Sequence, residues 1–250
     1  MKANYHSHTY RCHHASGSQR EYVENAIRAG YRIWGFSDHT PQLYNNGYVS
    51  PIRMLPGELE DYVKETLDLK KEYKDDIEIK LGLEVEYYPR HFDDLMKLIE
   101  DYPIEYLLLG QHHTNNEYDG IYVGFETSDE NVLKQYCAQV KEALDSKRFM
   151  YIAHPDLVHF TGDSGLYKEY MRKLCKDIKK AGIPAEINLQ GIWDGRNYPD
   201  RRFWKIAGEE GLDVVIGTDT HQSSKVDLPE SVKKAMELVD EFGLDLKEVL

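Results

Sequence analysis

Residues 213–221 read DVVIGTDTH. The first six, DVVIGT, form a short run rich in β-branched residues, and Asp219 and His221 come directly after it. Such a run is typical of a buried β-strand, and here an acid and a histidine follow its carboxyl end. The same combination recurs along the chain. Side chains at the carboxyl ends of parallel strands gather on one face, so this repetition bears directly on the fold.

Further runs of this kind alternate with longer amphipathic stretches. We predict strands near residues 3–8, 32–37, 77–85, 104–110, 149–153, 184–189 and 213–218. We predict helices near residues 18–29, 57–74, 91–101, 128–147, 164–181, 199–210 and 229–241. Gly30, Gly182 and Gly211 follow the ends of helices, where a left-handed cap is needed. Repeated strand–helix units predict an α/β fold with a parallel sheet.

The position of the reactive residues favours a barrel over an open sheet. An open, doubly wound sheet binds ligands mainly at one switch point, whereas a barrel builds its site from many strand ends. Histidines or acids follow nearly every predicted strand. A chain of 250 residues with 41% hydrophobic residues suits one domain, which we expect to span residues 1–250.

Composition limits the partners and the compartment. The formal net charge of -13 disfavours a nucleic-acid partner, although metal ions in an acidic protein can still attract a small phosphate ester. The three cysteines are odd in number and widely spaced, unlike a disulfide framework. The amino terminus MKANYHSH lacks an apolar segment, and no stretch is apolar enough for a membrane span. We expect a cytoplasmic protein without a membrane partner; its oligomeric state leaves no trace in the sequence.

Histidines and carboxylates form the candidate metal site. His6 and His8 are two residues apart on a predicted strand, so both imidazoles point to the same side, and Asp219 and His221 repeat this spacing. An isolated histidine at a strand end usually has a structural role, but seven of the eleven histidines lie at strand ends or in adjoining loops. The candidate ligands are His6, His8, His14, His39, Glu84, His112, His154, Asp219 and His221.

The donor types indicate the metal and the chemistry. Imidazole nitrogen with carboxylate oxygen suits Zn, Mn or Fe(II) better than Ca or Mg. These donors exceed what one ion can use, so we expect two or three ions, which could organise in-line attack on a phosphoester. No phosphate-binding P-loop is present, and Cys12, Cys137 and Cys175 lack a metal-ligand spacing. Cys12 lies beside the cluster, and we expect it to be packed rather than bound to metal.

In order along the chain, these motifs resemble those of the PHP (polymerase and histidinol phosphatase) family. The matching segments are His6-Ser7-His8, Cys12-His13-His14-Ala15, Ser37-Asp38-His39, Gly82-Leu83-Glu84, Gly110-Gln111-His112, Ala153-His154-Pro155 and Asp219-Thr220-His221. The resemblance runs nearly end to end. Glu186-Ile187-Asn188, Gly191 and Tyr198-Pro199 are most similar to the histidinol phosphatase branch.

The resemblance implies a distorted seven-stranded (β/α)7 TIM-like barrel with a trinuclear site. By position, His6, His8, Glu84 and Asp219 would hold one ion, Glu84, His112 and His154 a second, and His14, His39 and His221 a third. Glu84 would bridge the first two ions, and Glu84, Asp219 and His221 are the expected catalytic residues. His13 in place of His14, and His113 in place of His112, remain alternatives.

The resemblance also implies a substrate site near Arg196, the first choice for binding phosphate. Asn188 and Tyr198 would line the pocket or stabilise its loop. Arg11 and Arg53 are weaker candidates, which we expect to be solvated surface residues.

The implied activity is that of a metal-dependent phosphomonoesterase, hydrolysing L-histidinol phosphate to L-histidinol and phosphate in histidine biosynthesis. A PHP phosphatase for another ester, such as a nucleotide or a phosphotyrosyl protein, is the alternative within enzymes. A metal-stabilised binding module without catalytic activity is the alternative outside them.

Overall fold

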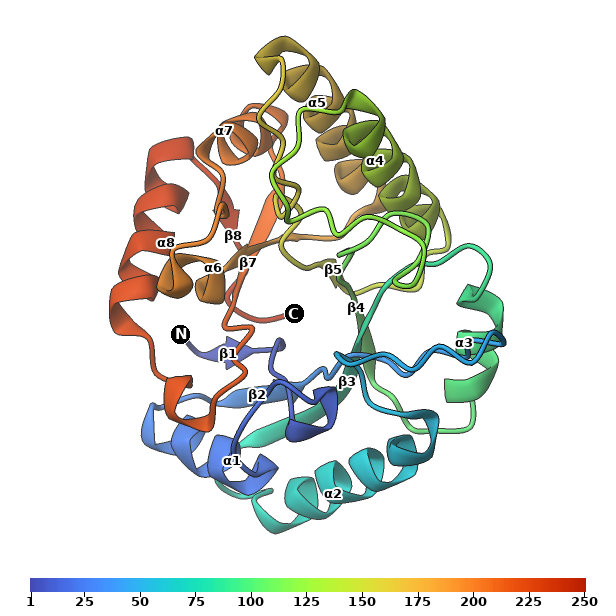
Figure 1. Cartoon of the computed structure of the whole chain (residues 1–250). Coiled ribbons are helices and arrows are strands. Elements are labelled where there is room, and N and C mark those ends of the chain that lie inside the picture. Colours follow the sequence, from blue (N-terminus) through green and yellow to red (C-terminus); the bar gives the residue numbers. More distant parts are fainter.

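The centre of the protein is an all-parallel sheet that curls, with the helices outside it (Figure 1). The computed structural model describes residues 1–250. The sheet has eight strands, which lie in sequence order: β1 Ala3–Asn4, β2 Ile33–Phe36, β3 Glu78–Val85, β4 Tyr106–Leu109, β5 Tyr151–Ile152, β6 Ala185–Asn188, β7 Asp213–Gly217 and β8 Asp245–Leu246. The predicted α/β class and parallel sheet are confirmed.

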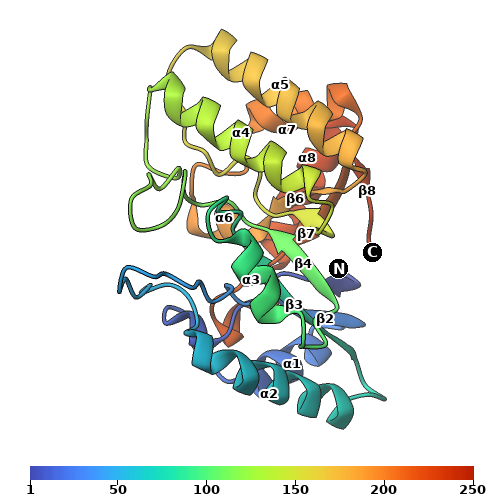
Figure 2. The same ribbon diagram turned by 90° about the vertical axis from the view of Figure 1, so that its right-hand side faces the viewer.

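Eight α-helices cover the sheet, and Figure 2 shows α4 and α5 packed together on one side with α1 and α2 on the other. They are α1 Gln19–Arg28, α2 Leu59–Glu72, α3 Phe92–Ile99, α4 Glu130–Asp145, α5 Ser164–Ala181, α6 Leu189–Asp194, α7 Arg201–Glu210 and α8 Pro229–Phe242. The seven predicted helices are confirmed to within a turn at each end. None of the helices combines the length and apolar character needed to cross a bilayer.

Local sequence signals explain where the helices begin and end. Ser18 and Glu21 form a reciprocal capping box at the start of α1, and Asp163 caps α5 by accepting a hydrogen bond from a backbone amide. Helices α5 and α7 end at Gly182 and Gly211, whose φ angles of +72° and +66° are left-handed.

The predicted count of seven strands is wrong, because the carboxyl terminus adds β8. This strand has only two residues, Asp245 and Leu246, and pairs with Asp213 and Val214 of β7. Two residues carry no hydrophobic periodicity, so the strand exists only because the folded chain brings it beside β7. Helix α6 was also missed, since its six residues follow β6 without an intervening loop.

Backbone contacts join the carboxyl ends of β1 and β7. Ser7 and Thr220 form a parallel bridge, the amide of His8 donates to the Thr220 carbonyl at 3.1 Å, and the amide of Asp219 donates to the His6 carbonyl at 2.9 Å. The residues that follow the first and seventh strands therefore lie side by side.

Tyr106 fills the interior of the curled sheet. A Cβ atom at Gly35 would lie 2.2 Å from the Tyr106 hydroxyl, and one at Gly82 would lie 2.3 Å from its ring, so the absence of both side chains makes room for this tyrosine. The hydroxyl lies 2.7 Å from the carbonyl oxygen of Tyr5 and 3.0 Å from that of Phe36. One buried hydroxyl thus contacts both the residue that follows β1 and the last residue of β2.

Replacing Tyr106 by Phe should lower the free energy of unfolding by about 1–3 kcal/mol, because buried carbonyls lose their hydrogen-bond donor. Urea unfolding measures the change. The control is Tyr170→Phe, which removes a surface hydroxyl bonded to Glu130 and should cost less than about 0.5 kcal/mol. Equal effects of the two substitutions would contradict the structural role of Tyr106.

Candidate metal centre

All nine predicted ligands meet in one cluster at the carboxyl ends of the strands. Four sets made up only of these predicted ligands have donor atoms that lie within 4.8 Å of one another. The sets are His6, His8 and Asp219; His6, Glu84 and His154; His8, His39 and Glu84; and His14, His39 and His221. His112 completes the cluster, with Nε2 3.9 Å from Glu84 Oε1 and its ring 4.7 Å from that of His154.

Two members of the cluster have strained backbones. His154 and Asp219 are non-glycine residues with positive φ angles, +30° and +49°, and both follow strand ends, those of β5 and β7. Such conformations cost free energy and concentrate at functional sites. The sharp turns direct these two side chains into the cluster.

Glycines at two positions leave space for the buried carboxylates of Glu84 and Glu186. A Cβ atom at Gly110 would lie 1.8 Å from Glu84 Oε1, and one at Gly217 would lie 1.8 Å from Glu186 Oε1. Glycine is therefore required beside both carboxylates.

Buried carboxylates orient the first pair of histidines. His6 Nδ1 lies 2.8 Å from Glu186 Oε1, and His8 Nδ1 lies 3.3 Å from Asp38 Oδ1. A proton on each Nδ1 leaves the Nε2 lone pair directed at Glu84 and Asp219. This arrangement is usual behind metal-binding histidines, because the carboxylate fixes the tautomer and raises the basicity of the ring.

Backbone carbonyls orient two further histidines in the same way. His14 Nδ1 lies 2.7 Å from the Cys12 carbonyl, and His221 Nδ1 lies 3.0 Å from the Asp219 carbonyl. Both rings again present Nε2 to the cluster. Four of the candidate ligands thus share one orientation.

Several donor atoms have no hydrogen-bond partner within the protein. Glu84 Oε2, His39 Nδ1 and His221 Nε2 are buried and unpaired. His39 Nδ1 lies 2.9 Å from Glu84 Oε2, but without the geometry of a hydrogen bond. Buried polar groups are nearly always paired, so a cation between these atoms fits the residues present.

Protonation states match such a cation. Burial opposes ionisation of Glu84, but the surrounding histidines outweigh it and hold the Glu84 pKa well below its usual value. Burial lowers the pKa of His39 to about 3 and that of His221 well below its usual value. Glu84 is therefore ionised, while His39 and His221 are neutral, as metal ligands must be.

The pKa values of His6 and His8 are raised, unlike those of His39 and His221. Burial opposes their protonation, but hydrogen bonds to Asp219 and Asp38 raise the pKa of His8 to about 9, and nearby carboxylates also raise the pKa of His6. Protons on these rings balance the negative charge of the buried acids. Binding of a metal cation would displace those protons.

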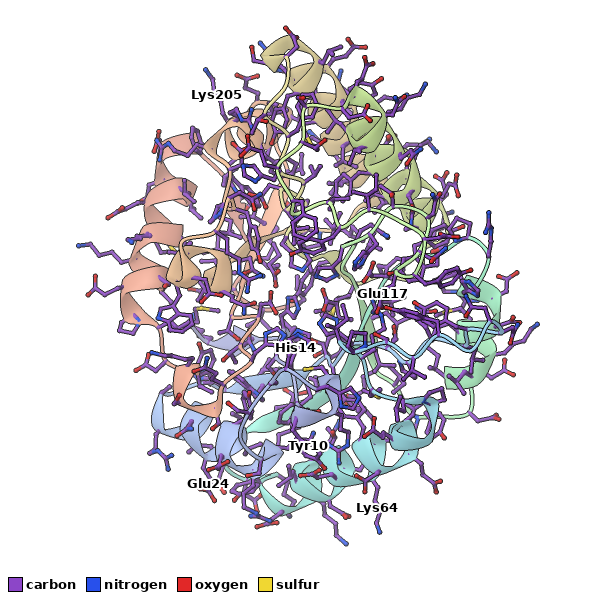
Figure 3. The ribbon with its side chains drawn as sticks, viewed as in Figure 1. Tyr10, His14, Glu24, Lys64, Glu117 and Lys205 are labelled. Atoms are coloured by element: carbon purple, nitrogen blue, oxygen red, sulfur yellow. The ribbon has the colours of Figure 1, made fainter.

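The structure separates the two histidines of each neighbouring pair. His13 points away from the cluster, with Nε2 3.7 Å from Glu58 Oε2, whereas His14 lies beside His39 and His221. In Figure 3, His14 lies near the middle of the ring of strands. The geometry favours His14 as the ligand.

His112 and His113 diverge in a similar way. His112 Nε2 faces Glu84, while its Nδ1 lies 3.3 Å from Glu86 Oε1. His113 Nδ1 lies 3.6 Å from Glu86 Oε2, and its ring packs on Tyr122. The geometry favours His112 as the ligand.

A cleft of about 470 Å³ opens above the cluster. It is lined by His14, His39, Tyr48, Pro51, Ile52, His112, His113, Glu117, Tyr122, Phe125, Gln190, Arg196, Tyr198, Asp219 and His221. A larger hollow of about 850 Å³ lies beside α3 and contains none of the predicted ligands. The smaller cleft is the candidate substrate site, because candidate metal ligands line it.

Two of the three predicted substrate residues line this cleft. Arg196 donates to Asp194 through Nε and Nη2 and to the Tyr198 hydroxyl through Nη1 at 3.3 Å. Asn188 lies behind the floor instead, where its Nδ2 is 3.0 Å from both Glu186 Oε2 and Asp219 Oδ2. Arg196 can therefore meet a ligand, whereas Asn188 positions Asp219.

The expectation that Arg11 and Arg53 are solvated is wrong. Both side chains are 1% exposed. Arg11 pairs with Asp61 and Glu65, and Arg53 pairs with Glu86 and Glu117. A buried guanidinium needs such partners, and they lie too far along the chain for a local sequence pattern to reveal them.

Cys12 is buried, and its sulfur lies within 4.8 Å of donor atoms of His8 and His221. Burial raises the pKa of its thiol, which keeps the sulfur protonated. The protonated thiol suits the packing role expected for it.

Sequence patterns did not identify the buried acids that face the Nδ1 atoms of candidate ligands, namely Asp38, Glu86 and Glu186. Asp38 and Glu186 occur within strand-end motifs, and Glu86 follows Glu84 by two residues, so the strand period places both on one face. The two-residue spacing of Glu84 and Glu86 was the sequence signal that could have identified Glu86.

Comparison with known proteins agrees with this geometry. A family model described as PHP domain matches residues 4–190, well over half of the chain. The probable histidinol-phosphatase of Deinococcus radiodurans is 28% identical over 230 residues, which cover 88% of this chain and 86% of that protein.

Two solved structures share the fold. The putative histidinol phosphatase of Listeria monocytogenes has a TM-score of 0.77 at 22% identity, covering 92% of this chain and 99% of that one. The histidinol phosphate phosphatase of Lactococcus lactis, solved with Zn, L-histidinol and phosphate, has a TM-score of 0.76 at 21% identity, covering 98% and 95%. Because the family model matches most of the chain and its motifs meet at one cluster, this chain belongs to the PHP domain family.

Proposed function

We propose that this chain is a metal-dependent phosphomonoesterase that hydrolyses L-histidinol phosphate to L-histidinol and phosphate, a reaction of histidine biosynthesis. One observation carries the proposal: a cluster of metal-ligand types forms the floor of a cleft whose wall contains Arg196. The similarity to histidinol-phosphatases, which spans most of the chain, supports the substrate. The relative that was solved with Zn, L-histidinol and phosphate supports the same pairing of metal and ligand.

Two or three divalent transition-metal ions, Zn, Mn or Fe, are the proposed cofactors. We assign His6, His8, Glu84 and Asp219 to one ion, Glu84, His112 and His154 to a second, and His14, His39 and His221 to a third. Unpaired donor atoms on Glu84, His39 and His221 support these assignments. Such ions supply Lewis-acid stabilisation of phosphoryl charge and make water a stronger nucleophile at neutral pH.

The protein's own residues hold and orient the reacting groups. Glu84 lies between the histidine sets, so we assign it the bridging role. Asp219 and His221 both line the cleft and belong to the cluster, which supports their assignment as catalytic residues. Arg196 also lines the cleft and can donate to phosphoryl oxygens, where a guanidinium forms strong charge-assisted hydrogen bonds.

His14→Ala should lower the metal content of the purified protein, because it removes one of three donors that lie close together. His13→Ala, the matched control, should leave the metal content unchanged, because His13 faces Glu58. Elemental analysis after reconstitution with Zn, Mn or Fe measures both variants. Equal metal loss in the two variants, or none in either, would contradict the assignment of His14.

Glu84→Gln should reduce kcat roughly 100-fold or more, because an amide cannot replace a bridging carboxylate and several kcal/mol of transition-state stabilisation are lost. Circular dichroism should show an intact fold. Glu72→Gln changes an exposed carboxylate paired with Arg20 and should have no effect on kcat. Nearly normal turnover of Glu84→Gln would show that the centre is misassigned.

L-histidinol phosphate should be hydrolysed with a much higher kcat/KM than p-nitrophenyl phosphate, a nucleotide or a phosphotyrosyl peptide, since selectivity comes from transition-state contacts around the common metal chemistry. Steady-state kinetics of the metal-loaded protein test this. Arg196→Ala should reduce kcat/KM by roughly 1.5–3 kcal/mol in barrier terms if Arg196 binds phosphate. Metal content should stay constant.

Arg202→Ala is the matched control for Arg196, because Arg202 pairs with Asp200 outside the cleft. Comparable efficiency on a nucleotide or phosphotyrosyl ester would replace the proposed substrate but keep a phosphoesterase. Complete inactivity of the metal-loaded protein on every ester would support the binding module instead.

A further inference from the structure

The cleft also contains a carboxylate that is not part of the metal cluster. Glu117 lies in the segment between β4 and α4 and lines the cleft together with Tyr48, Tyr122 and Phe125. Its side chain is 4% exposed. It belongs to none of the sets of candidate metal ligands, so the proposed metal chemistry does not use it.

A network of donors fixes the position of Glu117. Its Oε1 accepts hydrogen bonds from the Tyr48 hydroxyl at 2.9 Å and from Ser50 Oγ at 2.6 Å. Its Oε2 accepts one from Arg53 Nε at 2.6 Å. A carboxylate has about four acceptor positions, so this one can accept another donor. The group is held rigidly and retains capacity for a ligand.

The network carries more negative than positive charge. Arg53 is its only guanidinium, and it contacts two buried carboxylates, Glu86 and Glu117. With His112 and His113, which also face Glu86, in their neutral forms, one positive charge against two negative charges leaves an excess of one negative charge on this wall. A cation placed beside Glu117 would balance it, and in a partly buried cleft such an attraction is screened less than at the surface.

Glu86 and Glu117 lie on a different side of the site from Arg196. Arg196 follows α6, and Figure 1 shows α6 and α3 on opposite sides of the curled sheet. In Figure 3, Glu117 is displaced from His14 towards the α3 side. The cleft therefore presents a guanidinium and metal ligands to an anion, and a carboxylate elsewhere to a cation.

We infer that Glu117 binds the cationic end of the substrate and thereby selects phosphate monoesters of amino alcohols over those of uncharged alcohols. The inference rests on the proposed function, because L-histidinol phosphate has a phosphate at one end and an ammonium and an imidazole at the other. Tyr48, Tyr122 and Phe125 supply aromatic faces beside Glu117, which suit a flat ring or a cation. Phe125 is 70% exposed, so a ligand in the cleft would cover apolar surface.

Glu117→Gln tests this by removing the charge while keeping the shape. KM for L-histidinol phosphate should rise roughly tenfold with little change in kcat, the pattern expected when one charged hydrogen bond in substrate binding is lost. KM for p-nitrophenyl phosphate, which has no cation, should stay within roughly twofold. Phosphoethanolamine and glycerol phosphate form a second pair, of which only the first should be affected.

Glu126→Gln is the matched control, because Glu126 lies on the same segment but is exposed and does not line the cleft. It should leave all four KM values unchanged. Equal changes for cationic and uncharged esters in Glu117→Gln would mean that Glu117 only supports the loop, and no change for any ester would also overturn the inference. Wild-type protein that hydrolyses other esters but not L-histidinol phosphate would instead contradict the proposed function.

A measurement on wild-type protein covers the case in which Glu117→Gln fails to fold. L-histidinol and its N-acetyl derivative are compared as competitive inhibitors at a pH where the imidazole is neutral, so that only the ammonium charge differs. Stronger inhibition by L-histidinol supports a carboxylate that binds the cation. Equal inhibition by the two compounds overturns it.

Discussion

Glu84 is the buried charge on which the rest of the site depends. Its carboxylate is 1% exposed and is surrounded by histidines from several strand ends, with one oxygen lacking any hydrogen bond. An isolated charge at such a position would be strongly unfavourable, so the surrounding positive charge, from protons or from metal ions, is what allows it to stay ionised. Gly110, the strained turn at His154 and the junction of β1 with β7 all serve to bring that charge and its partners together.

A second layer of buried acids surrounds the candidate ligands and orients them. Glu186, Asp38 and Glu86 each face the Nδ1 atom of a candidate ligand, which leaves the other nitrogen free for the cluster. Glu86 also shares Arg53 with Glu117, so the layer that orients the metal ligands continues into the wall of the cleft. One network of buried charges therefore links the orientation of the candidate metal ligands to the charge on the wall of the cleft.

Much of the fold was predictable because it depends on local patterns. Apolar β-branched runs identified seven strands, amphipathic periodicity and caps identified seven helices, and strand-end histidines and acids identified the nine candidate ligands that meet in the structure. The elements that escaped prediction were short. β8 and α6 have two and six residues, too few for a hydrophobic period to appear, and β8 is a strand only because β7 lies beside it.

The sequence by itself determined the strand–helix alternation and the donor types, because both depend on residue identity and on spacing within a few positions. The resemblance to the family's motifs already favoured His14 over His13 and His112 over His113, but only the tertiary structure shows that the two members of each pair face different groups. The tertiary structure also decided that Arg53 is buried and that Glu117 lines the cleft. The physical reason is that burial and ion pairing are set by segments distant in sequence: Glu117 lies 64 positions from the arginine it binds, and no local pattern encodes that meeting.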